Sequence, residues 1–210
     1  MKRAEAIAGK TLGDVASKQQ SKTPETLLFD KGWIGQFLEH ILGATAGSKP
    51  EPDFVELGIE LKTIPIDTSG KPLESTFVCA IQLMQRQHET WQTSLVKKKL
   101  NHVLWLPILS EKDLPIEQRI IGMPLLWQPT DKQERILQTD WEETMDKIML
   151  GKFGSLNSKF GVALQVRPKA ANSRVLTDAI GINGNIIKTL PRGFYLRTSF
   201  TQSILASLSY

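Results

Sequence analysis

The chain has 210 residues, of which 40% are apolar and 23% are charged, so it is long enough for one globular domain or for one domain folded as two lobes. It has one cysteine, Cys79, and three histidines with no zinc-ligand spacing, which excludes an internal disulfide and argues against a zinc enzyme or a Cys/His hydrolase. No apolar run is long enough to span a bilayer and the N-terminus lacks the apolar core of a signal peptide, so we expect a cytoplasmic protein.

The net charge of +4 is unevenly distributed along the chain. From Lys152 to the C-terminus there are eight basic residues and one acid, Asp178, a net charge of +7, whereas the first 151 residues carry 18 basic and 21 acidic residues, a net charge of −3. A basic surface can simply aid solubility, but among small and polar residues it favours a polyanion as the partner. The sequence therefore predicts two lobes, a mildly acidic one over about residues 1–150 and a basic one over about 151–210.

The spacing of apolar residues predicts helices and strands in mixed order. Steps of three and four residues predict a helix within 23–44, with Gly43 as its end. Alternation predicts a strand over about 54–64 and an antiparallel partner over about 76–83, joined by a turn. The later elements that we expect are a short basic helix or turn leading into a buried strand within 93–109, a long amphipathic helix over 129–152, a strand at about 162–167, a helix at about 173–180, a strand at about 193–198 and a C-terminal helix. This order favours an α/β or α+β fold with a mixed central sheet.

The stretch "PEPDFVELGIELKTIP" contains the pattern D-x6-E-x-K, formed by Asp53, Glu60 and Lys62. Alternation alone favours a solvated polar strand face on which Glu60 and Lys62 form a weak ion pair. The same spacing also allows the two carboxylates to converge on Mg²⁺, which prefers hard oxygen donors, together with the backbone carbonyl of Leu61. Lys62 would then hold or polarise the attacking water and offset charge on the phosphorane, which is phosphodiester-cleaving chemistry. Glu39, within an apolar helix pattern, is either a third carboxylate of this site or a surface residue.

Several longer stretches resemble one family throughout the chain. These are "DKGWIGQFLEHILGATAGSKPEPDFVELGIELKTIPID", "FVCAI", "KKLNHVLWLP", "PLLWQP", "DWEETMD", "QVRPKAAN" and "LPRGFYL", in the same order from about residue 10 to about 205. They are similar to the MutH family, the strand-nicking endonucleases of methyl-directed DNA mismatch repair, which belong with the PD-(D/E)xK restriction-type nucleases. The resemblance implies that fold, a mixed β-sheet flanked by helices in two lobes around a DNA cleft, with the basic lobe reading DNA.

The resemblance also implies an activity, a cofactor and partners. The activity is incision 5′ to the G of GATC on the unmethylated strand of hemimethylated double-stranded DNA. The cofactor is Mg²⁺, with Mn²⁺ or Ca²⁺ as substitutes, and the activator is MutL, which acts with the mismatch sensor MutS.

Residue roles follow from the same resemblance. The catalytic residues that it implies are Asp53, Glu60, Lys62, Glu39 and Lys99, with Asp53, Glu60, Glu39 and the Leu61 carbonyl around the metal. The residues that it implies at the DNA are Lys31 and Gly32 at the minor groove, Phe77, the loop Arg167, Pro168 and Lys169 in the major groove, and Tyr195 beside the adenine whose methylation is sensed. Lys97 and Lys98, next to Lys99, leave open which lysine acts at the phosphate.

Reasoning from the residues agrees with part of this assignment and leaves alternatives. Arginine is the usual bidentate reader of guanine, which suits Arg167 at the end of a predicted strand, while Tyr195 could equally be an aromatic packed in the core. A GATC-specific restriction endonuclease of the same fold would cut both unmethylated strands without an activator. A non-catalytic DNA-binding or scaffold protein would be expected to have lost a carboxylate or the lysine of the site, and none is lost here.

Overall fold

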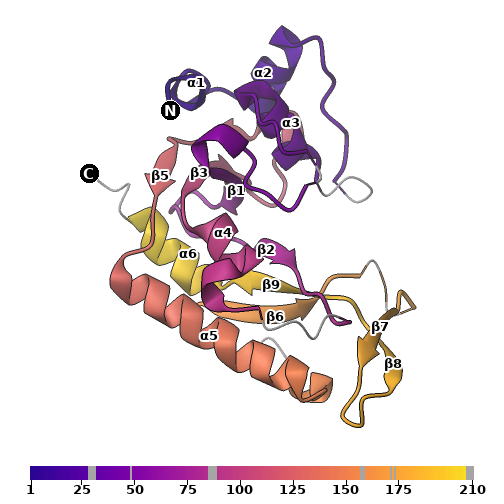
Figure 1. Ribbon diagram of the computed structural model, residues 1–210. Helices are drawn as coiled ribbons and strands as arrows, with labels where there is room; N and C mark the ends of the chain where they lie inside the picture. The colour runs from indigo at the N-terminus through magenta and orange to yellow at the C-terminus, as the bar shows by residue number, and fades with distance from the viewer. Residues whose placement is uncertain are drawn as a thin grey trace. The chain divides into compact units, whose positions relative to one another are not determined.

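The computed structural model describes residues 1–27, 32–47, 49–84, 89–156, 159–170, 172 and 174–206 (Figure 1). The chain divides into two compact units, each made of discontinuous segments. Unit 1 comprises Met1–Glu74, Asn101–Gln128 and Thr201–Tyr210, and unit 2 comprises Ser75–Leu100 and Pro129–Phe200. The boundary expected near residue 150 lies within unit 2, and the functional division into two lobes around a DNA cleft stays a prediction.

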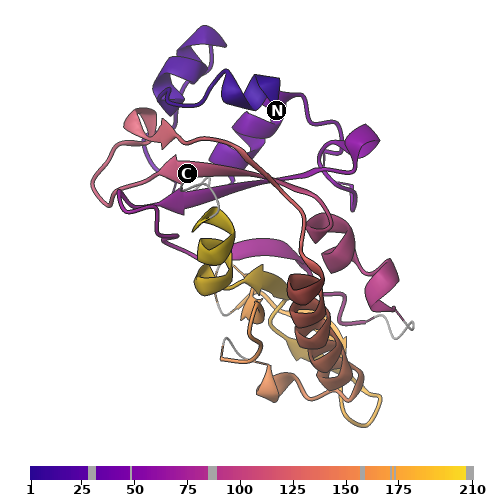
Figure 2. The same cartoon turned by 90° about the vertical axis from the view of Figure 1, so that its left-hand side faces the viewer.

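Unit 1 is built on a four-stranded sheet of mixed direction. Strands β1 (Glu60–Ile66) and β3 (Val103–Leu109) pair in parallel, and β4 (Ile120–Ile121) and β5 (Leu125–Trp127) each pair antiparallel with β3. In Figure 2 the purple arrow of β1 and the pink arrow of β3 point the same way. The expected mixed sheet flanked by helices is therefore confirmed, and β3 is buried along almost its whole length, as a central strand should be.

Three helices, α1 (Lys2–Glu5), α2 (Leu12–Lys18) and α3 (Trp33–Leu42), cover one face of this sheet (Figure 2). The core between them contains Leu12, Leu38, Leu42, Leu61 and Leu106, all at most 5% exposed. α3 ends where expected, at Gly43, whose φ of +85° is a left-handed conformation that favours glycine. The core thus holds α3 and the start of β1 against each other.

Unit 2 contains a three-stranded antiparallel sheet, a separate hairpin and a long helix. The sheet has the order β2 (Thr76–Ala80), β9 (Arg192–Leu196), β6 (Leu164–Pro168), and the hairpin pairs β7 (Thr177–Ile180) with β8 (Ile186–Thr189). The helix α5 (Asp131–Met149) runs alongside β6 (Figure 1). Two short helices, η2 (Trp91–Thr93) and α4 (Leu95–Leu100), complete the part of the unit that carries functional candidates.

Asp140 connects α5 to the start of β6. Its carboxylate is 4% exposed and accepts hydrogen bonds from three successive backbone N–H groups, those of Val162, Ala163 and Leu164, at 2.6–2.9 Å. A buried carboxylate with three N–H donors is well satisfied, so this contact anchors the beginning of β6 on the helix. The helix α6 (Thr198–Leu205) follows β9, and the described residues end one position after it, at residue 206.

Three details of the predicted secondary structure are wrong. The strand expected over 54–64 begins only at Glu60, because residues 55–57 form the 3-10 helix η1 (Val55–Leu57) with Val55 and Leu57 exposed. The expected antiparallel pair of 54–64 with 76–83 does not form, since β1 pairs with β3 and β2 pairs with β9. In place of the helix expected at about 173–180, the structure has the strand β7 from Thr177 to Ile180. Within the described ranges, no helix has both the length and the apolarity needed to cross a membrane.

Candidate active site

Asp53 and Glu60 stand opposite each other because a short loop folds the chain back between them. Phe54 and Ile59 form an antiparallel bridge, with distances of 2.9 Å from Phe54 N to Ile59 O and 3.3 Å from Ile59 N to Phe54 O. The 3-10 helix η1 and Gly58, whose φ is +62°, make the reversal inside this bridge. Asp53 immediately precedes this bridged pair and Glu60 immediately follows it. The six residues between them are therefore the two bridging residues and the four residues of the loop that they close.

Both carboxylates of this pair are buried in unit 1. Asp53 is 8% exposed, and its Oδ2 accepts a hydrogen bond of 2.8 Å from the N–H of Leu61. Glu60 is 1% exposed, and its Oε1 lies 2.5 Å from the Nζ of Lys62, two residues further along the same strand face. The solvated ion pair that alternation favoured is therefore wrong, because the two side chains are only 13% (Lys62) and 2% (Glu60) exposed.

Such burial argues for a role other than stability. Removing two charges from water commonly costs more than their mutual attraction returns, so a buried ion pair is weak evidence of a stabilising device. Here the pair lies beside a second buried carboxylate, that of Asp53, at the first residues of β1. We refer to Asp53, Glu60 and Lys62 as the acid–lysine site, whose catalytic role stays a prediction at this point.

Glu39, the other predicted carboxylate, lies on α3 and is half-buried. Its backbone oxygen accepts hydrogen bonds from Gly43 N at 3.0 Å and Ala44 N at 2.8 Å, where the helix ends. In the described part of the chain, no three side chains of His, Cys, Asp or Glu come close enough together to hold a metal ion. Glu39 thus does not complete a preformed three-ligand site with Asp53 and Glu60, and the ligand roles of Glu39 and of the Leu61 carbonyl stay predictions.

Four residues predicted to contact DNA gather on the three-stranded sheet of unit 2. Phe77 and Tyr195 are register partners on β2 and β9, with their rings edge to face and 5.2 Å between centroids. The Nζ of Lys169 lies 3.3 Å from the centroid of Phe77, and the Cζ of Arg167 lies 5.9 Å from that of Tyr195. We call Phe77, Arg167, Lys169 and Tyr195 the basic–aromatic group, an arrangement that combines cation–π contacts with exposed cations.

The sheet register brings this group together. On β6, Arg167 lies opposite Gly193 of β9, and a Cβ at Gly193 would stand 2.8 Å from a ring carbon of Phe77, so the glycine leaves room for that ring. Pro168 and Lys169, which follow, are exposed, and the N–H of Lys169 donates to Pro191 O at 2.7 Å. Alternation holds on β9, where Phe194 is 3% exposed while Tyr195 is only half-buried. Tyr195 is therefore not a fully buried core aromatic.

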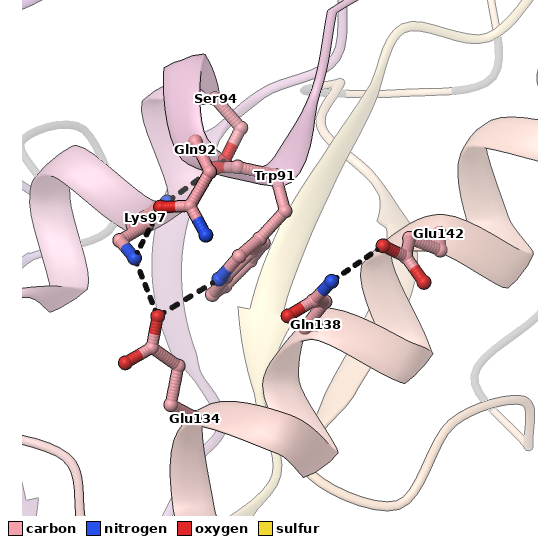
Figure 3. Close-up of polar contacts among 7 residues, drawn as sticks. All are labelled: Trp91, Gln92, Ser94, Lys97, Glu134, Gln138 and Glu142. Carbon is pink, nitrogen blue, oxygen red and sulfur yellow. Dashed lines mark hydrogen bonds and ion pairs between the residues drawn. The ribbon is translucent and has the colours of Figure 1, made fainter. Parts of the chain in front are cut away.

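The three consecutive lysines on α4 occupy different environments. Lys97 is half-buried, and its Nζ lies 2.5 Å from Glu134 Oε1 and 2.7 Å from Gln92 Oε1 (Figure 3). The Nε1 of Trp91 donates to the same Glu134 oxygen at 3.1 Å. The lysine hydrogen bond, followed by that of the tryptophan, holds the pKa of Glu134 below its ordinary range. Lys98 is exposed and Lys99 is half-buried.

Of the two residues predicted at the minor groove, the structure describes only one. Lys31 falls outside the described residues, and Gly32 precedes α3 as its exposed N-cap residue. Three residues in the hydrogen-bond networks around the candidate cations were not predicted from the sequence: Trp91, Glu134 and Ser75. The hydroxyl of Ser75 accepts a hydrogen bond of 2.7 Å from Arg167 Nη1. No local signal identifies them, because their partners lie 37 to 92 residues away in the chain.

Comparison with known proteins gives consistent matches over nearly the whole chain. Residues 42–140 match the sequence model of the family described as "DNA mismatch repair enzyme MutH". The chain is 54% identical to the DNA mismatch repair protein MutH of Vibrio vulnificus strain YJ016 over 205 residues, which is 98% of this chain and 90% of the relative. It is 54% identical to that of Yersinia enterocolitica serotype O:8 over 204 residues (97% and 90%), and 52% identical to that of Escherichia coli strain SMS-3-5 over 204 residues (97% and 89%).

Proposed function

The chain belongs to the MutH family of DNA mismatch repair proteins, and on that premise we propose that it is a Mg²⁺-dependent endonuclease. The proposed substrate is double-stranded DNA with a hemimethylated or unmethylated GATC site, nicked 5′ to the G on an unmethylated strand. The observation that carries the proposal is the acid–lysine site, in which two buried carboxylates lie beside one lysine. Acting on chromosomal DNA of a bacterium, such an enzyme would work in the cytoplasm.

The donor chemistry of the acid–lysine site fits a hard divalent cation. Asp53 and Glu60 offer carboxylate oxygens at the start of one strand, shielded from bulk water, and this donor type suits Mg²⁺ and also Mn²⁺ or Ca²⁺. Glu39 and the Leu61 carbonyl are proposed as further ligands. A bound Mg²⁺ would supply charge stabilisation to the transferring phosphoryl group and lower the pKa of a bound water.

Lys62 performs a separate task in this proposal. An ammonium group has three N–H donors, and one of them is directed at Glu60 Oε1. The remaining donors can orient a water or a phosphate oxygen without moving the lysine, because the ion pair already fixes its position. Positioning of this kind, made before the substrate arrives, is what lowers the barrier of a phosphoryl transfer.

The basic–aromatic group is proposed to read the GATC sequence, with Pro168 between its two cations. Arginine and lysine recognise the O6 and N7 atoms of guanine in the major groove, and Arg167 and Lys169 are the exposed cations of the group. Tyr195 is proposed to lie beside the adenine, Lys31 and Gly32 at the minor groove, and Lys99 at a phosphate near the bond that is cut. MutL is proposed as the activator, with MutS acting through it.

Incubation with plasmid DNA tests the proposal directly. Unmethylated, hemimethylated and fully methylated GATC plasmids would be incubated with the protein and Mg²⁺, with and without MutL, and nicks scored strand by strand. We expect weak nicking alone, stimulation by MutL and incision only of unmethylated strands. Cleavage of both unmethylated strands without MutL stimulation would instead identify a restriction endonuclease, and an inactive wild-type protein under all these conditions would contradict the proposal.

A further inference from the structure

Two side chains that bind Glu134, those of Lys97 and Trp91, connect η2 and α4 to α5 within unit 2. Figure 3 shows Lys97 and Trp91 converging on one oxygen of Glu134, the first from α4, the second from η2 and the acceptor from α5. Trp91 is 3% exposed, so its indole is fixed by packing as well as by this hydrogen bond. Gln92 adds a second acceptor to Lys97. The lysine is thereby held in place by groups of its own unit.

The start of α4 is fixed by a further set of contacts. Ser94, which is fully buried, donates from Oγ to Trp91 O at 2.8 Å and accepts from Lys97 N at 3.1 Å. This hydroxyl therefore links the end of η2 to the first turn of α4. Because both the backbone N–H and the Nζ of Lys97 have partners that are themselves fixed, the helix has little freedom to rotate about its axis.

The geometry of a helix converts this constraint into a position for Lys99. Successive residues are about 100° apart around the axis, so Val96 and Leu100 share one side, Lys97 and Lys99 flank it, and Lys98 points away from it. The burial agrees, since Val96 and Leu100 are each 1% exposed, Lys97 and Lys99 are half-buried and Lys98 is exposed. Fixing Lys97 against α5 therefore fixes the direction of Lys99 on the other flank.

We propose that Lys97 is a positioning residue that acts through Glu134 and Trp91 to orient α4, so that Lys99 is presented to the DNA phosphate while Lys97 itself contacts no DNA. This inference rests on the proposed endonuclease function and deepens it, because it assigns different tasks to neighbouring lysines that the sequence does not distinguish. A lysine that already shares Glu134 and Gln92 would have to give up both partners to reach a phosphate.

A double-mutant cycle distinguishes positioning from phosphate contact. The variants are Lys97→Met, Glu134→Gln and their combination, with Lys97→Arg as a conservative replacement and Lys132→Met as a control that removes an exposed positive charge from α5. We expect each single variant to lower the single-turnover nicking rate with Mg²⁺ by roughly tenfold, because a small displacement of a reacting group is costly. The double variant should match either single one, since the residues act as a unit. Lys97→Arg and Lys132→Met should nick at close to the wild-type rate.

Binding to GATC duplex in Ca²⁺ over a salt series separates a direct phosphate contact of Lys97 from an effect that Lys97 exerts through Lys99. In a Lys99→Ala background, which already lacks the Lys99 phosphate contact, we expect Lys97→Met to leave the log–log salt slope unchanged, because Lys97 acts on the phosphate only through Lys99. A further slope reduction of about 0.9 for Lys97→Met in that background would show that Lys97 itself contacts a phosphate and would overturn the proposal. Additive rate losses, or wild-type rates for both single variants, would overturn it as well.

Two further outcomes are also decisive. If Lys97→Met fails to fold by thermal melting, Glu134→Gln and Lys97→Arg carry the test alone, and a wild-type nicking rate for Glu134→Gln then overturns the proposal. If wild-type protein does not nick hemimethylated GATC plasmid, the endonuclease function fails. Wild-type nicking together with uncoupled variants overturns only the positioning role.

Discussion

The acid–lysine site of unit 1 and the basic–aromatic group of unit 2 hold their charges in opposite ways. Glu60 and Asp53 are almost fully buried and are fixed by an ion pair and a backbone hydrogen bond. Arg167 and Lys169 are exposed and rest on aromatic rings. Buried charges cannot adapt but act strongly at short range, whereas exposed cations on rings can move to meet a base edge. The proposed chemistry and the proposed DNA recognition would therefore use charged groups in different surroundings within one chain.

The largest effect should come from neutralising a buried charge. We expect Glu60→Gln, and likewise Asp53→Asn, to lower Mg²⁺-dependent nicking more than about a hundredfold, while DNA binding is kept or tightened because less negative charge faces the phosphate. Lys62→Ala should also be severely impaired. Glu56→Gln, which removes an exposed carboxylate from the adjoining 3-10 helix, is the matched control. Near wild-type nicking by Glu60→Gln would remove the catalytic assignment.

Removing an exposed cation that is proposed to read a base should have a smaller effect, and the loss of binding affinity should depend on the DNA sequence. Arg167→Ala is expected to weaken binding to GATC duplex by about 1–3 kcal/mol relative to a scrambled duplex, the usual value of one bidentate base contact. Arg174→Ala, which removes a nearby exposed arginine, should leave the preference unchanged. Equal losses of affinity on cognate and scrambled duplexes would show that Arg167 contacts only the backbone.

Tyr195 is intermediate in burial between these charged groups, since it is half-buried and packs against Phe77. N6-methylation of adenine adds an apolar group where a hydrogen-bond acceptor would sit, so a snug polar pocket discriminates by repulsion. We expect Tyr195→Ser to reduce the preference for unmethylated over methylated strands several-fold, and Tyr195→Phe, which keeps the ring contact, to separate the hydroxyl from the packing. Strand-resolved nicking of the three methylation states, alongside a thermal melt, measures this. An unchanged ratio would move methyl sensing elsewhere, with Pro168 as the next candidate.

Lys99 is expected to contribute equally to binding of every DNA sequence, as a residue that contacts a phosphate does. Lys99→Ala should weaken binding to all duplexes alike and reduce the log–log salt slope by about 0.9, the value of one phosphate contact. Titrations of cognate and scrambled duplexes over the same salt series give both quantities. A loss confined to the GATC duplex would instead place Lys99 at a base.

The smallest expected effect is the pH dependence of the Glu134 contact. The pKa of Glu134 is lowered, first by its hydrogen bond with Lys97 and then by that with Trp91. A carboxyl with a depressed pKa in the folded state stabilises fully above its unfolded pKa, near 4.5, and loses that contribution as the pH falls through the folded value. The melting temperature of Glu134→Gln should thus lie below that of wild type by on the order of 1–3 °C at neutral pH, and the difference should shrink below about pH 4.5. A constant difference down to pH 3 would contradict this origin.

Local chemistry in the sequence predicted some elements well. The periodic helix predicted within 23–44 and the amphipathic helix predicted over 129–152 are present as α3 and α5, because their apolar spacing agrees with their packing. The turn after β1 is also real, with the Asp67 side chain accepting from Ser69 and Lys71. The chain after that turn makes only an isolated bridge back to β1, and β2 pairs with β9 more than 100 residues later. Long-range pairing of that kind has no local signal.

Two misses have specific causes. The apolar alternation of Val55, Leu57 and Ile59 is typical of a strand, yet Gly58 in a left-handed conformation ends any continuous strand there. The prediction of a helix at about 173–180 did not take into account the stretch "GING" at 181–184. This stretch lies between two short β-prone segments, a pattern typical of a hairpin. At the candidate site, D-x6-E-x-K located the carboxylates, but nothing in the pattern revealed how completely they are buried, since that depends on α3 and β3 packing around them.

The bridge between Phe54 and Ile59 has a consequence for how related sequences should vary. What keeps Asp53 opposite Glu60 is closure of the loop, and the exposed side chains of Val55 and Leu57 contribute little to it. Lengthening a loop that remains closed costs only about 0.6 kcal/mol per doubling of its length. Insertions after Leu57 should therefore be tolerated as long as the bridge forms, so the number of residues between the aspartate and the glutamate is free to drift in evolution while the pair itself stays in register.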